Sequence, residues 1–312
     1  MNPDAADRCY ARPVDQLRRA ITSDFSLRVV AAVTTGLVTE ACNRHALRGI
    51  EAVALGRALT AGCLLTTLTK GDAERLRLEL RGSGPLRGLL VDARGDGSVR
   101  GCLQRHLTAE EHERLSVGTG RLTVAPALGL HGTLVVTRDL GLEQRYQGSV
   151  EVMTGEVDRD LEHYLNTSEQ LPSVLACEVV LDHHDRVQRA AGVLVQTFPG
   201  GDTAELDRLR GVIAAGNLGD LLRHDRSCEE LIGFALMGEA HDDMGASPLQ
   251  FRCTCGPDRA RTVVSTLGAD DIDALAAEQS QTEIRCEYCG AVYSLSADQL
   301  RALAAEIRRE RS

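Results

Sequence analysis

The sequence predicts an α+β fold: an N-terminal antiparallel-sheet domain with packed helices, then a helical linker, then a small module near the C-terminus. Short apolar runs with two-residue periodicity are separated by glycine-containing turns, which predicts antiparallel strands rather than βαβ units. Segments with helical spacing occur before and after these strands. Two short pairs of cysteines close to the C-terminus indicate that the last module folds around a bound ion.

The chain is expected to begin with a tail, a strand and two helices. Residues 1–13 are predicted to be a mobile tail. Residues 25–30 alternate in polarity, which predicts a strand. Thr34 or Thr35 offers an N-cap for a first helix. A longer helix is predicted at 49–68, where small and apolar residues repeat on one face and permit close packing.

A meander of strands is predicted after these helices. From Glu74 to Leu80, leucines alternate with charged residues, as in a half-buried strand. Glycine-containing turns are predicted at 82–85 and 94–97, and a helix at 158–165. The further predicted strands are short and mainly apolar, and lie at 86–92, 99–104, 132–138, 143–153, 173–181 and 187–198.

A change of composition at 199–202 marks a boundary. Between residues 199 and 250, ten acidic residues face four arginines, which gives a net charge of −6. Leucine and isoleucine repeat there at helical spacing, but glycines interrupt the pattern, each costing about 1 kcal/mol against alanine inside a helix. We expect a helical linker of low intrinsic stability that depends on docking; an ordinary helical connector is the alternative. The expected division is a tail at 1–13, an α+β domain at 14–199, the linker at 200–250 and the C-terminal module at 251–312.

Four cysteines in that module have the spacing of a metal site. Cys253 and Cys255 form a C-x-C pair. Thirty residues later, Cys286 and Cys289 form a C-x-x-C pair. This arrangement suits four thiolates on one tetrahedral Zn²⁺ and predicts a zinc-binding module. Spacing alone leaves two uses open, a structural site and a redox site, because closely spaced thiols also pair with each other once a metal is lost.

The surroundings of the cysteines are expected to balance their charge. Four thiolates with one Zn²⁺ carry about two net negative charges. Arginines lie near the cysteines in sequence and are expected to offset this charge; they are Arg252, Arg259, Arg261 and Arg285. Helices are predicted within the module at 270–277 and 297–309.

Composition restricts the class of protein. The 312 residues are 43% hydrophobic and 26% charged, which is ordinary for a globular chain. A net charge of −10 weighs against nucleic-acid binding, since phosphates would repel it. No signal-peptide core is apparent and no run approaches the roughly 18 apolar residues of a membrane span, so we expect a cytoplasmic protein without membrane contact. Ten cysteines there indicate thiols and metal ligands rather than disulfide staples.

Other motifs are predicted to be structural. The glycine-rich stretch 82–88 resembles a nucleotide loop but leads into a strand rather than a helix, so a turn is expected. His183 and His184 fall at the tip of a predicted hairpin and are expected to be exposed. Cys63 and Cys177 are expected in the core. No set of side chains indicates an active site, and we do not expect an enzyme.

With these elements in place, the chain resembles the heat-shock protein 33 family of redox-regulated chaperones, also called 33 kDa chaperonins. The resemblance runs from about Asp15 to Arg309, and its most specific part is the C-x-C, thirty residues, C-x-x-C arrangement. At 190–192, Ala-Ala-Gly stands where the family more often has Ala-Gly-Gly, and a close backbone approach is still expected. Other stretches that carry the resemblance lie at 56–61, 84–86, 99–101 and 164–173.

The resemblance implies an ATP-independent holdase that protects unfolding proteins from aggregation under oxidative stress. The reduced, inactive form would bind one Zn²⁺ per chain through the four cysteines. Oxidation would convert these into the redox-active disulfides Cys253–Cys255 and Cys286–Cys289, with loss of zinc. The acidic linker would then undock and expose apolar surface to client proteins, and the active form would be a homodimer.

Physical reasoning supports a metal-dependent module, and two other hypotheses stay open. Structural zinc contributes on the order of 10 kcal/mol to folding, which a module of about sixty residues with few large apolar side chains cannot easily replace. A zinc-module adaptor that binds protein or RNA without redox switching would be insensitive to oxidant. An enzyme with a structural zinc would need a deep pocket lined by titratable residues in the N-terminal domain.

Overall fold

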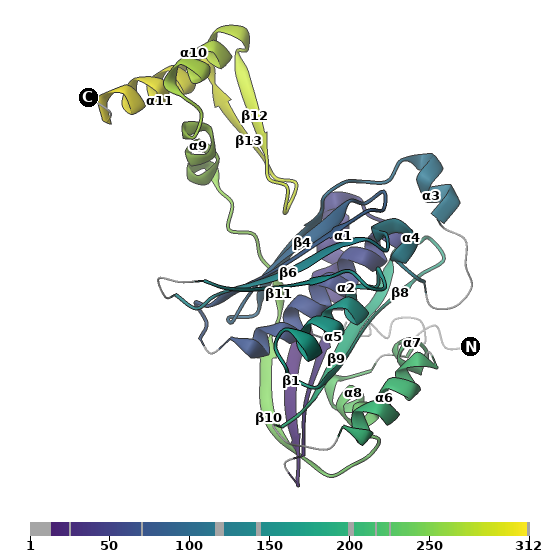
Figure 1. Cartoon of the computed structure of the whole chain (residues 1–312). Coiled ribbons are helices and arrows are strands. Elements are labelled where there is room, and N and C mark those ends of the chain that lie inside the picture. The colour runs from purple at the N-terminus through teal and green to yellow at the C-terminus, as the bar shows by residue number, and fades with distance from the viewer. Residues whose placement is uncertain are drawn as a thin grey trace, which may run out of the picture. The chain divides into compact units, whose positions relative to one another are not determined.

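The structure, a computed structural model, shows the predicted α+β class (Figure 1). Backbone contacts divide the chain into two units, of which the first ends at Arg252 and the second begins at Cys253. The predicted tail at 1–13 lies outside the described residues. The residues that the structure describes are 14–24, 26–69, 71–115, 122–141, 145–198, 203–215, 217–224 and 226–310.

Two sheets form the framework of the first unit. The antiparallel five-stranded sheet has the order β10 (His241–Pro248), β1 (Gln16–Thr22), β2 (Leu27–Val33), β9 (Val187–Thr197) and β8 (Ser173–Leu181). The six-stranded sheet has the order β11 (Gln250–Phe251), β5 (Ser98–Leu103), β4 (Gly88–Arg94), β3 (Arg75–Gly82), β6 (Gly132–Asp139) and β7 (Tyr146–Glu151). Among the described strands of this sheet, only β11 runs parallel to its neighbour. Each strand predicted between residues 74 and 198 is confirmed to within three residues at either end.

Helix α2 (Gly49–Leu65) lies in the main core and contacts strands of both sheets (Figure 1). It continues as a 3-10 turn, η1 (Thr66–Leu68). The expectation of one buried face is wrong, because the two sheets enclose the helix and all 17 of its residues are buried. A β-carbon on Gly192 of β9 would lie 2.9 Å from Thr60 of this helix, which confirms the close approach predicted there.

The same helix has the length of a membrane-spanning segment. The stretch Gly49–Leu68 is long and apolar enough to cross a membrane by length and composition. Its apolar window is entirely buried inside the protein, as in a core helix. Glu51 and Arg57 interrupt the stretch, so it is not an unbroken run of about 18 apolar residues. Arg57 is neutralised in the core by Glu156 at 2.9 Å and Glu178 at 2.8 Å.

Other helices of the first unit lie around the two sheets. Helix α1 (Thr35–His45) begins at the predicted N-cap, and α5 (Val157–Thr167) matches the predicted helix at 158–165. Two short helices were not predicted, α3 (Ala109–Leu115) and α4 (Ala125–Leu128). None of the residues of α3 is buried, so it has no apolar periodicity for a sequence pattern to reveal.

The edge of the five-stranded sheet departs most from expectation. Strand β1 was not predicted, because Leu17 and Ala20 are buried on opposite faces of the sheet and do not alternate with polar residues. Strand β10 lies in the segment predicted to be helical, which corrects that part of the linker. Nearly all of its side chains are exposed, and it is held by antiparallel backbone pairing with β1.

Three short helices precede β10 and cover one face of the five-stranded sheet. They are α6 (Ala204–Ala214), α7 (Asn217–Leu222) and α8 (Cys228–Ala235). Their apolar side chains share a second core with that face of the sheet. The helical residues of this core are Leu206, Leu209, Ile213, Leu218, Leu222, Cys228, Leu231, Ile232 and Ala235. The helical repeats predicted between residues 206 and 236 are therefore confirmed.

The second unit is a hairpin with three helices. Its elements are α9 (Pro257–Ser265), α10 (Ala269–Glu278), β12 (Gln281–Arg285), β13 (Val292–Ser296) and α11 (Ala297–Glu310). Helices α10 and α11 confirm the predictions at 270–277 and 297–309, whereas α9 was not predicted. Among the described residues, its buried core holds eight side chains, three of them alanine and none aromatic.

Candidate metal centre

The four predicted cysteines come together in the second unit. Their sulfur atoms all lie within 4.8 Å of one another. The Sγ atoms of Cys253 and Cys286 are 3.7 Å apart, and those of Cys255 and Cys289 are 3.3 Å apart. A tetrahedral zinc site with Zn–S bonds of about 2.3 Å has sulfurs about 3.8 Å apart. In the described part of the chain, no other group of three or more histidine, cysteine or acidic side chains converges in this way.

A tight turn between β12 and β13 positions the second pair of cysteines. The backbone N–H of Cys286 donates to the carbonyl oxygen of Ala291 at 2.8 Å, and the N–H of Gly290 donates back to Cys286 at 2.8 Å. Gly290 has a φ of 70°, a conformation that glycine adopts without strain. The C-x-x-C-G sequence therefore closes a knuckle that directs both thiols to one side.

Hydrogen-bond donors surround the sulfur atoms. The Tyr293 hydroxyl lies 3.0 Å from Sγ of Cys255 and donates to it. The backbone N–H groups of Tyr288 and Ala291 donate to the sulfurs of Cys286 and Cys289 respectively. Such donors stabilise a negatively charged sulfur, so the environment is built for thiolates.

Two of these cysteines favour the protonated form when no cation is bound. Burial raises the pKa of the Cys286 and Cys289 thiols above the ordinary value, and the sulfur of Cys253 raises it further. A divalent cation reverses this effect because it binds the deprotonated form. Four converging sulfur ligands without oxygen ligands fit Zn²⁺ best among the common biological cations.

The arginines near the cysteines only partly behave as expected. Arg261 forms an ion pair with Glu306 of α11, and Arg259 donates to the hydroxyl of Thr254 at 3.3 Å. These two guanidinium groups thus have partners other than the sulfurs. The contact between Tyr293 and Cys255 was not predicted. No spacing rule links a tyrosine after the C-x-x-C pair to a cysteine nearly forty residues earlier.

The other described cysteines are buried away from this cluster. Cys63 and Cys177 lie in the main core, as predicted. Cys42 and Cys102 are also buried, and Cys228 is buried at the start of α8. Burial raises the pKa of Cys42 to about 12 and that of Cys228 to about 11, which keeps both thiols protonated at neutral pH. Cys9 lies outside the described residues.

The remaining candidates are structural. His183 and His184 are exposed at the turn between β8 and β9, as predicted. The stretch 82–88 forms the predicted turn between β3 and β4.

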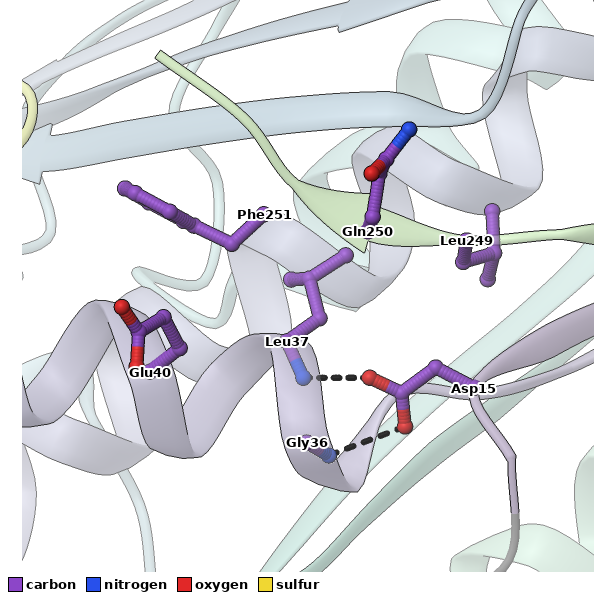
Figure 2. Close-up of a pocket in the computed structure, with 7 residues that line it drawn as sticks. All are labelled: Asp15, Gly36, Leu37, Glu40, Leu249, Gln250 and Phe251. Atoms are coloured by element: carbon purple, nitrogen blue, oxygen red, sulfur yellow. Dashed lines mark hydrogen bonds between the residues drawn. The ribbon is translucent and has the colours of Figure 1, made fainter.

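A shallow pocket lies in the first unit at the start of α1, and it carries two carboxylates, Asp15 and Glu40 (Figure 2). The Asp15 carboxylate accepts hydrogen bonds from the N–H groups of Gly36 and Leu37 and so caps α1. Glu40 pairs with Arg44 at 2.7 Å. Both carboxylates of the pocket thus bind groups of α1 and stabilise that helix.

Comparisons with known proteins agree with this architecture. The family model described as Hsp33 protein matches residues 15–296. The 33 kDa chaperonin of Geobacter sulfurreducens is 36% identical over 290 residues, covering 93% of this chain and 94% of that protein. The 33 kDa chaperonin of Synechocystis is 35% identical and covers 96% and 98%. The crystal structure of the 33 kDa chaperonin of Thermotoga maritima superposes with a TM-score of 0.82 at 25% identity, covering 95% of this chain and 99% of that one.

Proposed function

The chain belongs to the Hsp33 family of chaperones, and on that premise we propose that it is a redox-regulated, ATP-independent holdase. It would be inactive while its cysteines are reduced and active once they are oxidised to disulfides. The observation that carries this proposal is the convergence of four sulfurs within 4.8 Å. The coordination set would be Cys253, Cys255, Cys286 and Cys289, with one Zn²⁺ per chain.

The second unit depends on those cysteines because its own core is small. A bound Zn²⁺ would hold the four sulfurs as thiolates and contribute on the order of 10 kcal/mol to the folding of the unit. Among the described residues, the buried core of the unit has eight side chains and no aromatic ring. Such a core cannot easily replace the stabilisation that a metal would contribute. Loss of the sulfur ligands would therefore unfold this unit.

Oxidation removes the ligands directly. With a peroxide as oxidant, two thiolates, one peroxide and two protons yield one disulfide and two waters. Two such reactions consume all four sulfurs. We propose the pairs Cys253–Cys255 and Cys286–Cys289, which the resemblance to the family suggests. Short sulfur distances also join Cys253 to Cys286 and Cys255 to Cys289, so a disulfide map is needed to decide the pairing.

The segment before the cysteines would act as the linker at 200–250, between an α+β domain at 14–199 and a zinc-binding domain at 251–312. Its helices have 11, 6 and 8 residues, shorter than isolated helices need to be stable in water. Their order therefore depends on packing against the five-stranded sheet. The side chains of the sheet that they cover include Val29, Ala31, Val33, Val174, Ala176, Val193 and Val195.

The attachment of this segment to the first unit ends just before Cys253. The N–H of Gln250 donates to the carbonyl oxygen of Gly97, and that of Arg252 donates to Val99, each at 3.0 Å. Strand β11 has only two residues. We propose that unfolding of the second unit releases this short strand, then β10 and the helices, which exposes the apolar sheet face to unfolding client proteins. The net charge of −6 in the linker would keep the opened form soluble.

Several further properties belong to the same proposal. We propose that the active form is a homodimer through the first unit, that it acts in the cytoplasm during oxidative stress, and that it catalyses no reaction. The proposal includes no nucleic-acid or membrane partner, in keeping with the net charge of −10 and the full burial of α2.

The test follows zinc and chaperone activity in one sample. Reduced, zinc-loaded protein is treated with peroxide at mild heat, or with hypochlorite. Zinc release is measured with a chromophoric chelator, and aggregation of an unfolding client by light scattering. We expect suppression of aggregation to rise in step with zinc release. Equal protection by the reduced form would exclude the switch and favour an adaptor without redox function.

A further inference from the structure

One side chain from the C-terminal hairpin reaches across the cysteine cluster. Tyr293 lies on β13, paired with Ile284 of β12, and its hydroxyl contacts Sγ of Cys255 at 3.0 Å. Cys255 belongs to the other cysteine pair, at the start of α9. The tyrosine therefore connects the hairpin that carries Cys286 and Cys289 to the segment that carries Cys253 and Cys255.

This contact differs in kind from the other donors at the cluster. Cys286 and Cys289 accept from backbone N–H groups, which the turn provides whatever the side chains are. Cys255 accepts from a side-chain hydroxyl, which depends on a tyrosine at position 293. The half-buried ring of Tyr293 also restricts how far the hydroxyl can move away.

Hydrogen bonds to a thiolate have two consequences. They stabilise the charged form, and second-shell contacts of this kind typically change metal affinity 10–100-fold when removed. They also engage a sulfur lone pair and so lower the nucleophilicity that oxidation requires.

We propose that Tyr293 is a positioning residue that holds Cys255 as a metal-binding thiolate and slows its oxidation. This inference rests on the proposed zinc-bound, oxidation-sensitive state. In the step concerned, a lone pair of Sγ attacks one oxygen of a peroxide and the O–O bond breaks. The leaving oxygen takes a proton to become water, and Cys255 becomes a sulfenic acid. A second thiolate then attacks the sulfur of the sulfenic acid and displaces its hydroxyl group. The hydroxyl takes up one proton and leaves as water, and a disulfide remains.

The test compares Tyr293→Phe with Tyr146→Phe in the full chain. Both variants remove one tyrosine hydroxyl, and Tyr146 is 44% exposed on β7 of the first unit. We expect Y293F to release zinc several-fold faster under limiting peroxide and to bind zinc about 10-fold more weakly. Mass spectrometry after brief peroxide exposure should show Cys255 oxidised earlier than in the unmodified chain, with Y146F close to the unmodified chain.

A spectroscopic readout separates this role from a merely structural one. In the Co²⁺-substituted full chain, the sulfur-to-cobalt charge-transfer band reports the donor strength of the thiolates. We expect the band to move to longer wavelength in Y293F and to stay in place in Y146F. An unmoved band, or zinc release at the rate of the unmodified chain, would overturn the inference.

The outcomes also separate this inference from the proposed function. If the unmodified chain releases zinc and gains holdase activity on oxidation while Y293F behaves identically, only the role of Tyr293 fails. If the unmodified chain binds no zinc or shows no response to oxidant, the proposed function fails first.

Discussion

The Arg18 guanidinium donates two hydrogen bonds to the carboxylate of Asp243, from Nε at 3.0 Å and from Nη2 at 2.7 Å. The same guanidinium pairs with Glu229 of α8. Arg18 of β1 thus binds both β10 and α8. Helix α8 is the last helix of the segment that covers the five-stranded sheet. The hydrogen bonds to Arg18 lower the pKa of Asp243, so this contact is fully charged at neutral pH.

Replacing Arg18 by methionine should loosen the linker in the reduced protein. The three side chains are partly exposed, so solvent screens these ion pairs and their contribution to stability is small. We expect a modest increase in the rate of limited proteolysis within residues 204–248. Arg208→Met is the matched control, because Arg208 pairs only weakly, at 3.5 Å, with Glu205 of its own helix. Identical proteolysis of the two variants would refute the role given to Arg18.

Replacing Leu231 by alanine should weaken docking more strongly. Leu231 is completely buried in the second core, where loss of a leucine side chain typically costs 2–5 kcal/mol. We expect partial suppression of client aggregation without any oxidant. Met237→Ala in the same segment is the control, since Met237 is 42% exposed. If L231A stays as inactive as the reduced parent chain, client binding does not depend on uncovering this sheet face.

Cys228 should report undocking through its reactivity. Burial at the start of α8 raises its pKa to about 11, so almost none is thiolate at pH 8. Release of the helix would return the thiol to an ordinary pKa near 8.5, and alkylation should accelerate by about two orders of magnitude. Peptide mapping after iodoacetamide labelling measures this rate before and after oxidation of the cluster. Cys63, in the main core, should stay unlabelled in both states, and labelling of both cysteines would instead indicate global unfolding.

Removing one proposed metal ligand should unfold the second unit. In Cys289→Ser, we expect the zinc content to fall well below one per chain and the helical circular dichroism of α9 to α11 to be lost. Cys102→Ser, which changes a cysteine outside the cluster, should keep its zinc. A C289S chain with full helical signal and no zinc would show that the small core suffices without a metal.

The features that could be predicted from sequence are those whose own side chains show a characteristic spacing or periodicity. The cysteine spacing identified the cluster, because four ligands must converge on one ion. Alternation identified strands such as β3, whose leucines face the core and whose charged residues face outward. The Leu206–Leu236 pattern identified the covering helices for the same reason.

The features that were missed depend on partners distant in the chain. Most residues of strand β10 are exposed, so they show no apolar alternation. The strand is held in place by its backbone pairing with β1. The burial of α2 on every side follows from two sheets that no local pattern reveals. The contacts of Tyr293 with Cys255 and of Asp15 with the start of α1 likewise join residues that are more than twenty positions apart.

Hydrogen exchange of the amides at 204–248 tests most directly whether oxidation of the four cysteines releases the covering segment. The measurement uses the full-length chain, reduced with zinc and then oxidised with peroxide. We predict slow exchange in this segment in the reduced form and rapid exchange after oxidation, while β8 and β9 remain protected in both. Continued protection of 204–248 with all four cysteines in disulfides would contradict the account.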